Sequence, residues 1–347
     1  MRIAQIAPLA ESVPPGEYGG TERVVYNLTE ELVRRGHEVT LFASGDSRTS
    51  ARLVPVVEHS IGRDPLDRDP SAAILLALGT AFERASEFDI IHTHVEHFAL
   101  PFTRLVRVPT VSTFHGRLDG LGLQPLFQRY RDANLISVSN NQRLPLPYAN
   151  WVATVYNGVD VTRYTLERRK GSYLVFVGRV SREKGLETAV EVARRARLPL
   201  KIAAKIDPVD RQYFETSVRP LLGDPLVEFL GEIDDARKNT LLGGAQAMIF
   251  PVRWPEPFGL AMVEALATGT PVVAARAGAV EEIISHGKTG FVCDSAEEMV
   301  LGVKWAADLD RAYCRWNVER RFSVKAMVDG YEAAYQRVHG GAARHAA

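Results

Sequence analysis

Two glutamates, Glu256 and Glu264, flank the start of a predicted helix in the sequence EPFGLAMVEALATGTPVVA. Apolar residues recur at helical spacing from Leu260 onward, and a glycine separates them from the next β-rich run. Unpaired N–H groups near Phe258, Gly259 and Leu260 would face an anion such as a phosphate, and the helix dipole would favour it. Glu264 could accept a hydrogen bond from each of two adjacent ribose hydroxyls. The alternative is an ordinary helix with an acidic N-terminus and a solvated glutamate.

Two cations follow a predicted strand in the sequence FVGRVSREKG. The strand Tyr173–Gly178 would deliver Arg179 and Lys184 to the carboxyl edge of a parallel sheet, where open α/β folds bind ligands. Together the two cations can neutralise the charge that develops on a departing diphosphate. Arg182 and Glu183 are better explained as a solvated turn.

A glycine pair, Gly19 and Gly20, opens a predicted helix in the sequence EYGGTERVV. Without side chains, their backbone N–H groups can approach a ligand closely, although Gly-Gly also punctuates ordinary loops. The first strand is not followed by G-x-G-x-x-G, which argues against a dinucleotide oxidoreductase, and no Walker A sequence occurs.

In their order and spacing, these stretches resemble the motifs of family 4 of the retaining nucleotide-sugar glycosyltransferases, which have the GT-B fold. Glu256 and Glu264 match the E-x7-E signature of that family, and the sequence VYNGVD at Val155–Asp160 matches a further element. The resemblance implies transfer of a hexose from a nucleoside-diphosphate sugar to an acceptor hydroxyl, with retention at the anomeric carbon. It also implies no cofactor and no metal, because Arg179 and Lys184 would do what a metal does in other glycosyltransferases. Our preference for the nucleotide is UDP.

The resemblance assigns roles residue by residue. Arg179 and Lys184 would bind the diphosphate, Glu256 the hydroxyls of the sugar ring, and His115, in the sequence STFHG, would lie close to the transferred sugar. These four are the expected catalytic residues. The expected donor-binding residues are Gly19, Gly20, Lys205, Ile233, Phe258, Gly259, Leu260 and Glu264. Lys205 stands where many relatives have a glycine-rich turn, and Ile233 would pack against the base.

Several residues allow other interpretations. His115 could be a solvated loop residue, and His92, His94 and Glu96 alternate on one side of a strand, as metal ligands can. Buried histidines at strand ends are usually hydrogen-bonded instead, and we expect His94 to line the acceptor site. Two D-x-D sequences, at Asp67 and Asp308, resemble a metal motif of other glycosyltransferases, but neither follows a strand.

Strand-like and helix-like segments alternate and so predict an α/β fold with parallel sheets. The series begins with strands at Arg2–Ala7 and His37–Ala43 and restarts at Tyr173–Gly178. Between the two series, Tyr164–Gly171 is charged and lacks apolar periodicity, so we interpret it as a linker. We therefore expect two Rossmann-like domains facing across a cleft. Residues 1–163 would bind the acceptor, residues 172–323 the donor, and a helix at 324–340 would return to the first domain, with a frayed tail from His339.

The composition is that of a soluble globular protein, with 347 residues, 46% of them hydrophobic and 24% charged. The 42 basic and 42 acidic residues cancel, which excludes nucleic-acid binding by bulk positive charge. Cys293 and Cys314 fit neither a disulfide framework nor a zinc motif, so a reducing cytoplasm is expected. No apolar run of about 18 residues predicts a transmembrane helix. Four dispersed arginines could form a patch that contacts anionic lipids, although a solvated surface is the simpler interpretation. They are Arg104, Arg107, Arg129 and Arg131.

The acceptor is not encoded by these motifs and could be a saccharide, a small molecule or a lipid-linked sugar. Two alternative functions remain. One is a nucleotide-sugar epimerase or sugar phosphorylase of the GT-B fold, and the other is a non-catalytic protein that binds a nucleotide sugar.

Overall fold

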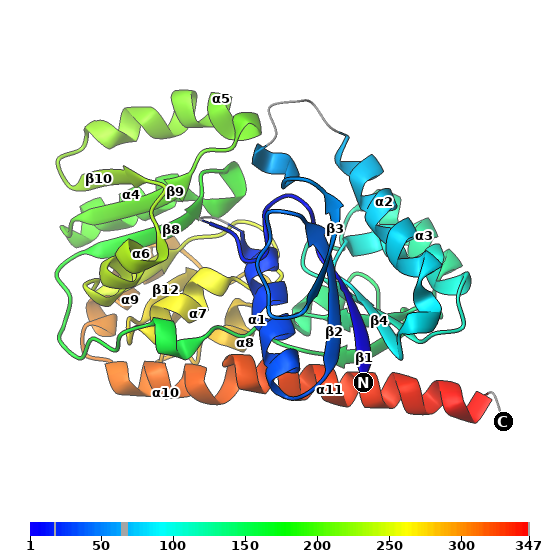
Figure 1. Cartoon of the computed structure of the whole chain (residues 1–347). Helices are drawn as coiled ribbons and strands as arrows, with labels where there is room; N and C mark the ends of the chain where they lie inside the picture. The colour runs from blue at the N-terminus through cyan, green and yellow to red at the C-terminus, as the bar shows by residue number, and fades with distance from the viewer. Residues whose placement is uncertain (17–18, 64–68, 346–347) are drawn as a thin grey trace. The chain divides into compact units, whose positions relative to one another are not determined.

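Two compact units make up the chain. The computed structural model describes residues 1–16, 19–63 and 69–345. Unit 1 comprises Met1–Gly158 and Val324–Ala347, and unit 2 comprises Val159–Ser323 (Figure 1). Each unit is built on a parallel β-sheet with helices packed against it, so both units are Rossmann-like.

The sheet of unit 1 has the strand order β3-β2-β1-β4-β5-β6-β7, and its paired strands run parallel. The strands are β1 (Arg2–Ile6), β2 (Glu38–Ser44), β3 (Arg52–Val57), β4 (Ile90–Thr93), β5 (Thr110–Phe114), β6 (Asn134–Ser137) and β7 (Trp151–Thr154). The helices are α1 (Gly20–Arg34), α2 (Pro70–Glu83), α3 (Gln124–Arg129) and α11 (Val324–His345).

The two faces of this sheet differ in polarity. Ile6 and Ile91 pack into an apolar cluster with Leu78 of α2. Because side chains alternate along a strand, their neighbours point to the other face. There Gln5 and His92 are hydrogen-bonded to a tyrosine of α11. The return of α11 to unit 1 therefore covers a polar region of the sheet.

The sheet of unit 2 has the strand order β10-β9-β8-β11-β12-β13 and is also parallel. Its strands are β8 (Leu174–Arg179), β9 (Leu200–Lys205), β10 (Val227–Gly231), β11 (Ala247–Phe250), β12 (Val272–Ala275) and β13 (Gly290–Cys293). Its helices are α4 (Leu186–Ala196), α5 (Arg211–Tyr213), α6 (Asp235–Gly243), α7 (Leu260–Ala267), α8 (Val280–Ile283), α9 (Ala296–Ala306) and α10 (Arg311–Arg321).

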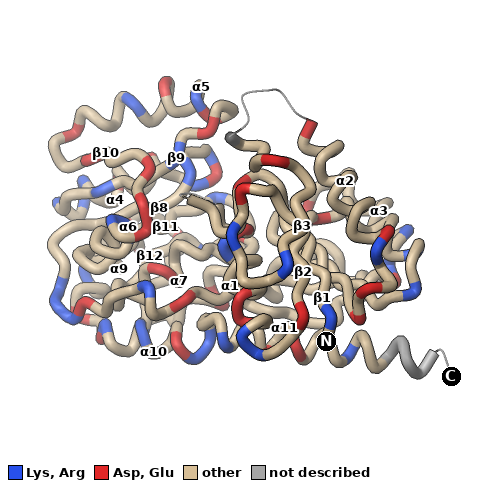
Figure 2. The backbone as a smooth tube through the Cα atoms, in the orientation of Figure 1, with Lys and Arg blue, Asp and Glu red and all other residues tan. Residues whose placement is uncertain are grey.

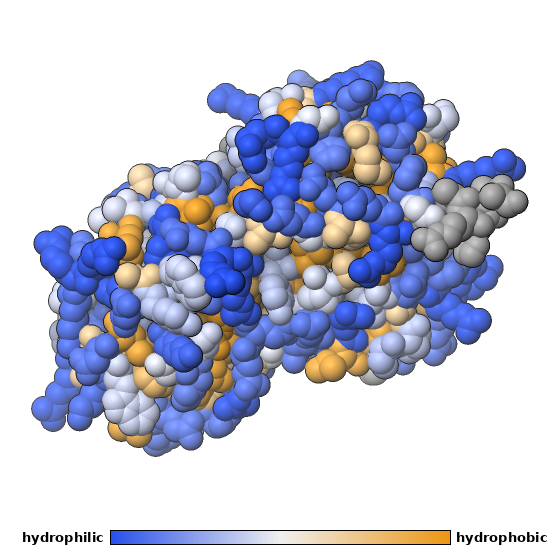
Figure 3. Space-filling model, turned by 90° about the horizontal axis from the view of Figure 1, so that it is seen from below, coloured by the Kyte–Doolittle hydropathy of each residue, from blue (hydrophilic) through white to orange (hydrophobic). Residues whose placement is uncertain are grey.

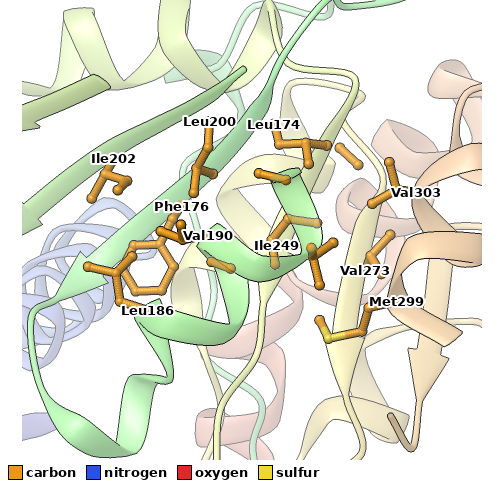
Figure 4. Packing of buried hydrophobic residues seen from close by; sticks show 14 of the residues in the cluster. Leu174, Phe176, Leu186, Val190, Leu200, Ile202, Ile249, Val273, Met299 and Val303 are labelled. Atoms are coloured by element: carbon orange, nitrogen blue, oxygen red, sulfur yellow. The ribbon is translucent and has the colours of Figure 1, made fainter. Parts of the chain in front are cut away.

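The core of unit 2 lies between this sheet and its helices. Figure 4 shows Phe176, Ile249 and Val273 of three strands together with Val190 of α4 and Met299 of α9, all buried in one cluster. Apolar burial of this kind stabilises the sheet and so fixes where its strands end. The ends of β8, β9 and β11 carry the polar residues described below.

Two expectations differ from the structure. Tyr164–Gly171 is packed within unit 2 rather than forming a linker, because the backbone of Glu167 is hydrogen-bonded to that unit. Its N–H donates to the carbonyl of Thr268 (3.0 Å), and its carbonyl accepts from the side-chain Nε of Arg311 (2.6 Å). Because these contacts are made by backbone and polar groups, the segment has no apolar periodicity from which its packing could be predicted. The C-terminal helix also runs beyond the predicted end, to His345.

Charges of both signs are interspersed along the chain (Figure 2). On the face seen in Figure 3, hydrophilic residues predominate and hydrophobic residues form small scattered groups. In the part of the chain that the structure describes, no helix combines the length and the apolar character needed to cross a bilayer.

Candidate active site

Lys184 and Glu256 form a largely buried ion pair in unit 2. Lys184 Nζ lies 2.5 Å from Glu256 Oε2, and the two side chains are 15% and 10% exposed. Trp254 donates its indole N–H to the same oxygen at 2.8 Å, and Lys184 Nζ lies 5.0 Å from the centre of a Trp254 ring. Hydrogen bonds between charged groups are about twice as strong as neutral ones, and the cation–π contact adds to them. The three side chains therefore hold one another in a fixed arrangement.

The turn after β8 and the segment after β11 carry this pair, and backbone contacts join them. The N–H of Arg253 donates to the carbonyl of Glu183 at 2.8 Å. Gly185 has a φ of +68°, and a Cβ there would lie 2.2 Å from the carbonyl oxygen of Pro251. Glycine is thus required for the two segments to touch.

A second close approach fixes the backbone of Glu256. The N–H of Ala279 donates to the carbonyl of Glu256 at 2.9 Å. At the preceding residue, Gly278, φ is +56°, and a Cβ would lie 2.2 Å from both the backbone nitrogen and the backbone oxygen of Glu256. The loop after β12 can therefore lie against Glu256 only if glycine stands at this position.

Helix α7 begins at Leu260, four residues after Glu256. Gly259 precedes it with a φ of +91°, and a Cβ there would lie 2.6 Å from Met262 Cε. Phe258 is 3% exposed and so anchors the segment. The first-turn N–H groups of any α-helix lack intrahelical acceptors, so the start of α7 can bind an anion close in the chain to the Lys184–Glu256 pair.

Arg179 ends β8 and pairs in register with Lys205, the last residue of β9. Arg179 Nη2 lies 2.8 Å from Glu183 Oε1, and Lys205 Nζ lies 3.6 Å from Asp207 Oδ1. Arg179 Nη1 and Nε lie 3.4 Å from Asp207 and 3.6 Å from Asp210. Burial raises the pKa of Asp210, the Arg179 charge opposes this rise, and Glu183 and Asp207 add to it. A phosphate binding at these cations would compete with carboxylates that already hold them.

Glu264 lies inside α7 and is buried, with 9% of its side chain exposed. Its Oε1 accepts a hydrogen bond from the Tyr164 hydroxyl at 3.0 Å and another from Lys238 Nζ at 2.9 Å. Lys238 also lies 3.3 Å from Asp235, on the same helix α6. Ile233, which we expected to contact the base, is half-buried just before α6.

In unit 1, the predicted glycine pair lies at the start of α1, whose first residue is Gly20. A Cβ at Gly19 would lie 2.6 Å from Pro15 Cβ, so the loop packs closely there. Glu17 and Tyr18, which belong to the same motif, lie outside the described residues.

His115 follows β5, and burial lowers its pKa to about 4, so its ring is neutral at pH 7. The backbone N–H groups of His115 and Gly116 both donate to Glu96 Oε1 at 3.0 Å. Glu96 has a φ of 53°, which is uncommon for a residue other than glycine. Burial raises the pKa of Glu96 to about 7, and the two N–H groups oppose that rise. Glu96 therefore holds the loop that carries His115.

The prediction that His94 lines the acceptor site is wrong. His94 is 1% exposed, and its ring nitrogens contact His115 (3.0 Å) and Gln5 (2.9 Å). His92 is buried as well, between hydroxyls of Tyr335 and Thr113. Both histidines are buried and hydrogen-bonded, as buried polar groups usually are. Among the residues that the structure describes, no three His, Cys, Asp or Glu side chains are grouped to hold a metal.

The D-x-D sequences have ordinary structural roles where they are described. Asp69 accepts a hydrogen bond from the N–H of Ser71 at the start of α2, and Asp310 accepts one from Ala312 at the start of α10. Both are helix N-caps. Asp67 lies outside the described residues.

Two family models match adjoining parts of the chain. The model described as Glycosyltransferase Family 4 matches residues 18–163, and the model described as Glycosyl transferases group 1 matches residues 163–320. The chain belongs to the family 4 glycosyltransferases. Its two Rossmann-like units have the GT-B fold, and it is an enzyme that transfers a sugar.

This family 4 glycosyltransferase has relatives and fold neighbours of nearly its own length. Glycogen synthase from Mycobacterium tuberculosis is 27% identical over 333 residues, which cover 81% of this chain and 80% of the relative. AviGT4, a glycosyltransferase involved in avilamycin A biosynthesis, is 26% identical with a TM-score of 0.75, over 98% of both chains. HepE from Anabaena in complex with UDP-glucose is 17% identical with a TM-score of 0.74, over 97% of this chain and 100% of HepE, and shares the fold.

Four residues of this candidate site were not predicted from the sequence: Tyr164, Lys238, Trp254 and Gly278. Tyr164 falls in the segment interpreted as a linker, and Lys238 lies on α6, a helix that was not predicted. Trp254 stands two residues before Glu256, in the sequence RWPEPFG, and this nearness was the available signal. Nothing in the local sequence around Gly278 shows that it touches Glu256.

Proposed function

We propose that the protein is a retaining glycosyltransferase that moves a hexose from a nucleoside-diphosphate sugar to an acceptor hydroxyl without a metal. The observation that carries this proposal is the 2.5 Å contact of Lys184 with Glu256, four residues before the N-terminus of α7. One end of that pair is suited to a phosphate and the other to sugar hydroxyls. Arg179, at the end of β8, adds a second cation.

In the proposed reaction the bond between the anomeric carbon and the diphosphate oxygen breaks. The acceptor oxygen bonds to that carbon on the same face, and the leaving diphosphate takes the acceptor proton. Arg179 and Lys184 stabilise the charge that develops on the diphosphate, and Glu256 orients the sugar through its ring hydroxyls. His115, at the end of β5, would bind a hydroxyl of the transferred sugar.

Glu264 would bind the ribose. Its Oε1 already accepts from Tyr164 and Lys238, so the ribose hydroxyls would donate to Oε2. UDP is our choice of nucleotide, since one protein with this fold, HepE, has been solved with UDP-glucose. The acceptor is left open, and the cytoplasm is the proposed location.

The donor can be identified by thermal shift with UDP, GDP, ADP and dTDP sugars, because only the nucleotide that binds the native state stabilises it. The enzyme would then be assayed for nucleotide release with a panel of saccharide acceptors, with and without EDTA. We expect release that depends on the acceptor and is unaffected by EDTA. Phosphate-dependent cleavage or an epimerised sugar would instead support the alternative functions, and loss of activity in EDTA would contradict metal independence.

The proposed site is tested by Lys184→Ala and Glu256→Gln. Each should lower kcat by about 100-fold, because Lys184 stabilises charge in the transition state and Glu256 orients the sugar. Lys304→Ala is the matched control, since Lys304 is an exposed lysine of α9 in the same unit. Near-normal turnover in both site variants would refute the assignment.

A further inference from the structure

A line of hydrogen bonds runs through unit 1 from His115 to the C-terminal helix. His115 Nε2 lies 3.0 Å from His94 Nδ1, and His94 Nε2 lies 2.9 Å from Gln5 Oε1. Gln5 Nε2 then donates to the Tyr335 hydroxyl at 3.1 Å, and that hydroxyl lies 2.7 Å from His92 Nδ1. The residues between His115 and α11 are buried, so water does not substitute for these partners.

The line continues past His92. His92 Nε2 lies 2.7 Å from Thr113 Oγ1, and Thr113 donates its hydroxyl to Tyr331 at 3.3 Å. Tyr331 and Tyr335 are both fully buried residues of α11. The line therefore begins at the end of β5 and ends on a helix more than 200 residues later in the sequence.

The direction of every bond follows from the Gln5 amide and from the neutrality of the histidines. Burial lowers the pKa of His92 and His94 well below the usual value, so each ring carries a single N–H at pH 7. Gln5 Oε1 can only accept, so His94 must donate from Nε2, which leaves His94 Nδ1 as an acceptor. His115 must then donate from Nε2.

The other half of the line agrees with this direction. Gln5 Nε2 donates to Tyr335, so the Tyr335 hydroxyl is free to donate to His92 Nδ1. His92 then donates from Nε2 to Thr113, whose own hydroxyl proton goes to Tyr331. Each group gives one proton and accepts one, so a single orientation of the Gln5 amide sets all of them.

We propose that Gln5 and Tyr335 are positioning residues that hold His115 in the tautomer with its proton on Nε2. Nδ1 of His115 is then an acceptor and would receive a hydrogen bond from a hydroxyl of the transferred sugar. The role of His115 Nδ1 as an acceptor for the sugar rests on the proposed function, whereas the tautomer of His115 does not. Helix α11 thereby acts on His115 through Gln5 and His94.

The tautomer can be read directly by long-range ¹⁵N–¹H NMR of the full chain labelled at histidine. His115→Gln and His94→Gln would assign the resonances. Wild-type His115 should show a protonated Nε2 and an unprotonated Nδ1 at pH 7. A proton on Nδ1 of His115 in the wild type would overturn the proposal.

Gln5→Leu and Tyr335→Phe remove the groups that set the direction, so His115 should become a mixture of tautomers in both. Gln5→Glu is the conservative rescue. With its carboxyl protonated in the buried site, the variant can donate its O–H to Tyr335 as the amide does and accept from His94 Nε2 with the other oxygen, so the His115 tautomer should persist. Thr93→Val is the matched control, since Thr93 is a buried residue of β4 that donates to Ser112 beside the line but outside it. An unchanged tautomer in both Gln5→Leu and Tyr335→Phe would refute the positioning role.

Activity gives a second readout. Gln5→Leu should lower kcat by about tenfold, the value of roughly one lost hydrogen bond, while donor affinity in unit 2 stays the same. Gln5→Glu should restore kcat. If the tautomer changes but kcat does not, the role of Nδ1 is wrong; if no acceptor supports turnover at all, the proposed function fails and the tautomer assignment stands.

Discussion

Glu264 shows how a single buried carboxylate is held ready for a ligand. Tyr164 and Lys238 both donate to Oε1, so the orientation of the other oxygen is fixed before any nucleotide binds. Preorganisation of this kind lowers the entropy that is lost on binding. Tyr164→Phe and Lys238→Met should therefore weaken nucleotide affinity by about tenfold each, the value of roughly one hydrogen bond, and change kcat less.

Isothermal titration with the nucleotide identified by thermal shift measures this effect. Tyr173→Phe is the matched control, because the Tyr173 hydroxyl also donates a hydrogen bond within unit 2, to the carbonyl of Leu241 at 2.8 Å. It should lower stability without changing affinity. Equal affinity in the wild type, Tyr164→Phe and Lys238→Met would contradict the role of Glu264.

At the scale of elements, the loop after β12 sets the position of Glu256. Gly278→Ala would place a methyl group 2.2 Å from two backbone atoms of Glu256, so the loop must move and the Glu256 carboxylate with it. We expect kcat to fall by about 10 to 100-fold, since small misplacements of a catalytic group are costly. Gly287→Ala separates this clash from backbone strain, because Gly287 also has a positive φ (+74°) but a Cβ added there would meet nothing within 4 Å.

Both variants should lose stability, whereas only Gly278→Ala should lose turnover. Acceptor-dependent nucleotide release and thermal unfolding, measured on the same preparations, distinguish the two effects. Equal turnover in the two variants would show that the contact with Glu256 is not needed for activity.

The elements that pattern alone could predict are those with strong apolar periodicity. The predicted strands at Arg2–Ala7 and His37–Ala43 match β1 and β2 to within one residue at each end. The strands that were missed, β3, β7 and β13, lie at the edges of their sheets and are short or interrupted. Most residues of β3 and β7 are not fully buried, and the proline in β3 further weakens its pattern, whereas β13 is buried but only four residues long.

The site was predictable only where its residues lie close together in sequence. Glu256 and Glu264 flank one helix, and Arg179 and Lys184 follow one strand, so their proximity follows from local structure. Three other residues contact these glutamates only through tertiary packing, which no local spacing encodes. Tyr164 and Lys238 contact Glu264, and Gly278 lies against Glu256. His94 is likewise held by residues distant from it in sequence, Gln5 and His115, and the residues around His94 give no sign of these contacts.

At the scale of the whole molecule, the buried polar groups of unit 1 give its stability a defined pH dependence. His115, with a pKa lowered to about 4, and the more strongly shifted His92 and His94 bind fewer protons folded than unfolded. Their contribution to the free energy of unfolding is full above about pH 6.5, the ordinary histidine pKa, and is lost as the pH falls through that value toward 4. Glu96 acts oppositely: its pKa of about 7 means that folding binds an extra proton between pH 4.5 and 7.

Glu96→Gln isolates the second effect, because glutamine keeps an oxygen for the N–H groups of His115 and Gly116 but has no charge to bury. The wild type should lose stability relative to Glu96→Gln as the pH rises from 5 to 8, by at most about 3 kcal/mol for a shift of this size, and by less because the residue is only half-buried. Hydrogen exchange of the β5 amides measures this within unit 1 and does not require the two units to unfold together. Glu58→Gln, at an exposed glutamate of the same unit, should give no such difference. A constant gap between the wild type and Glu96→Gln from pH 5 to 8 would show that Glu96 does not titrate in this range.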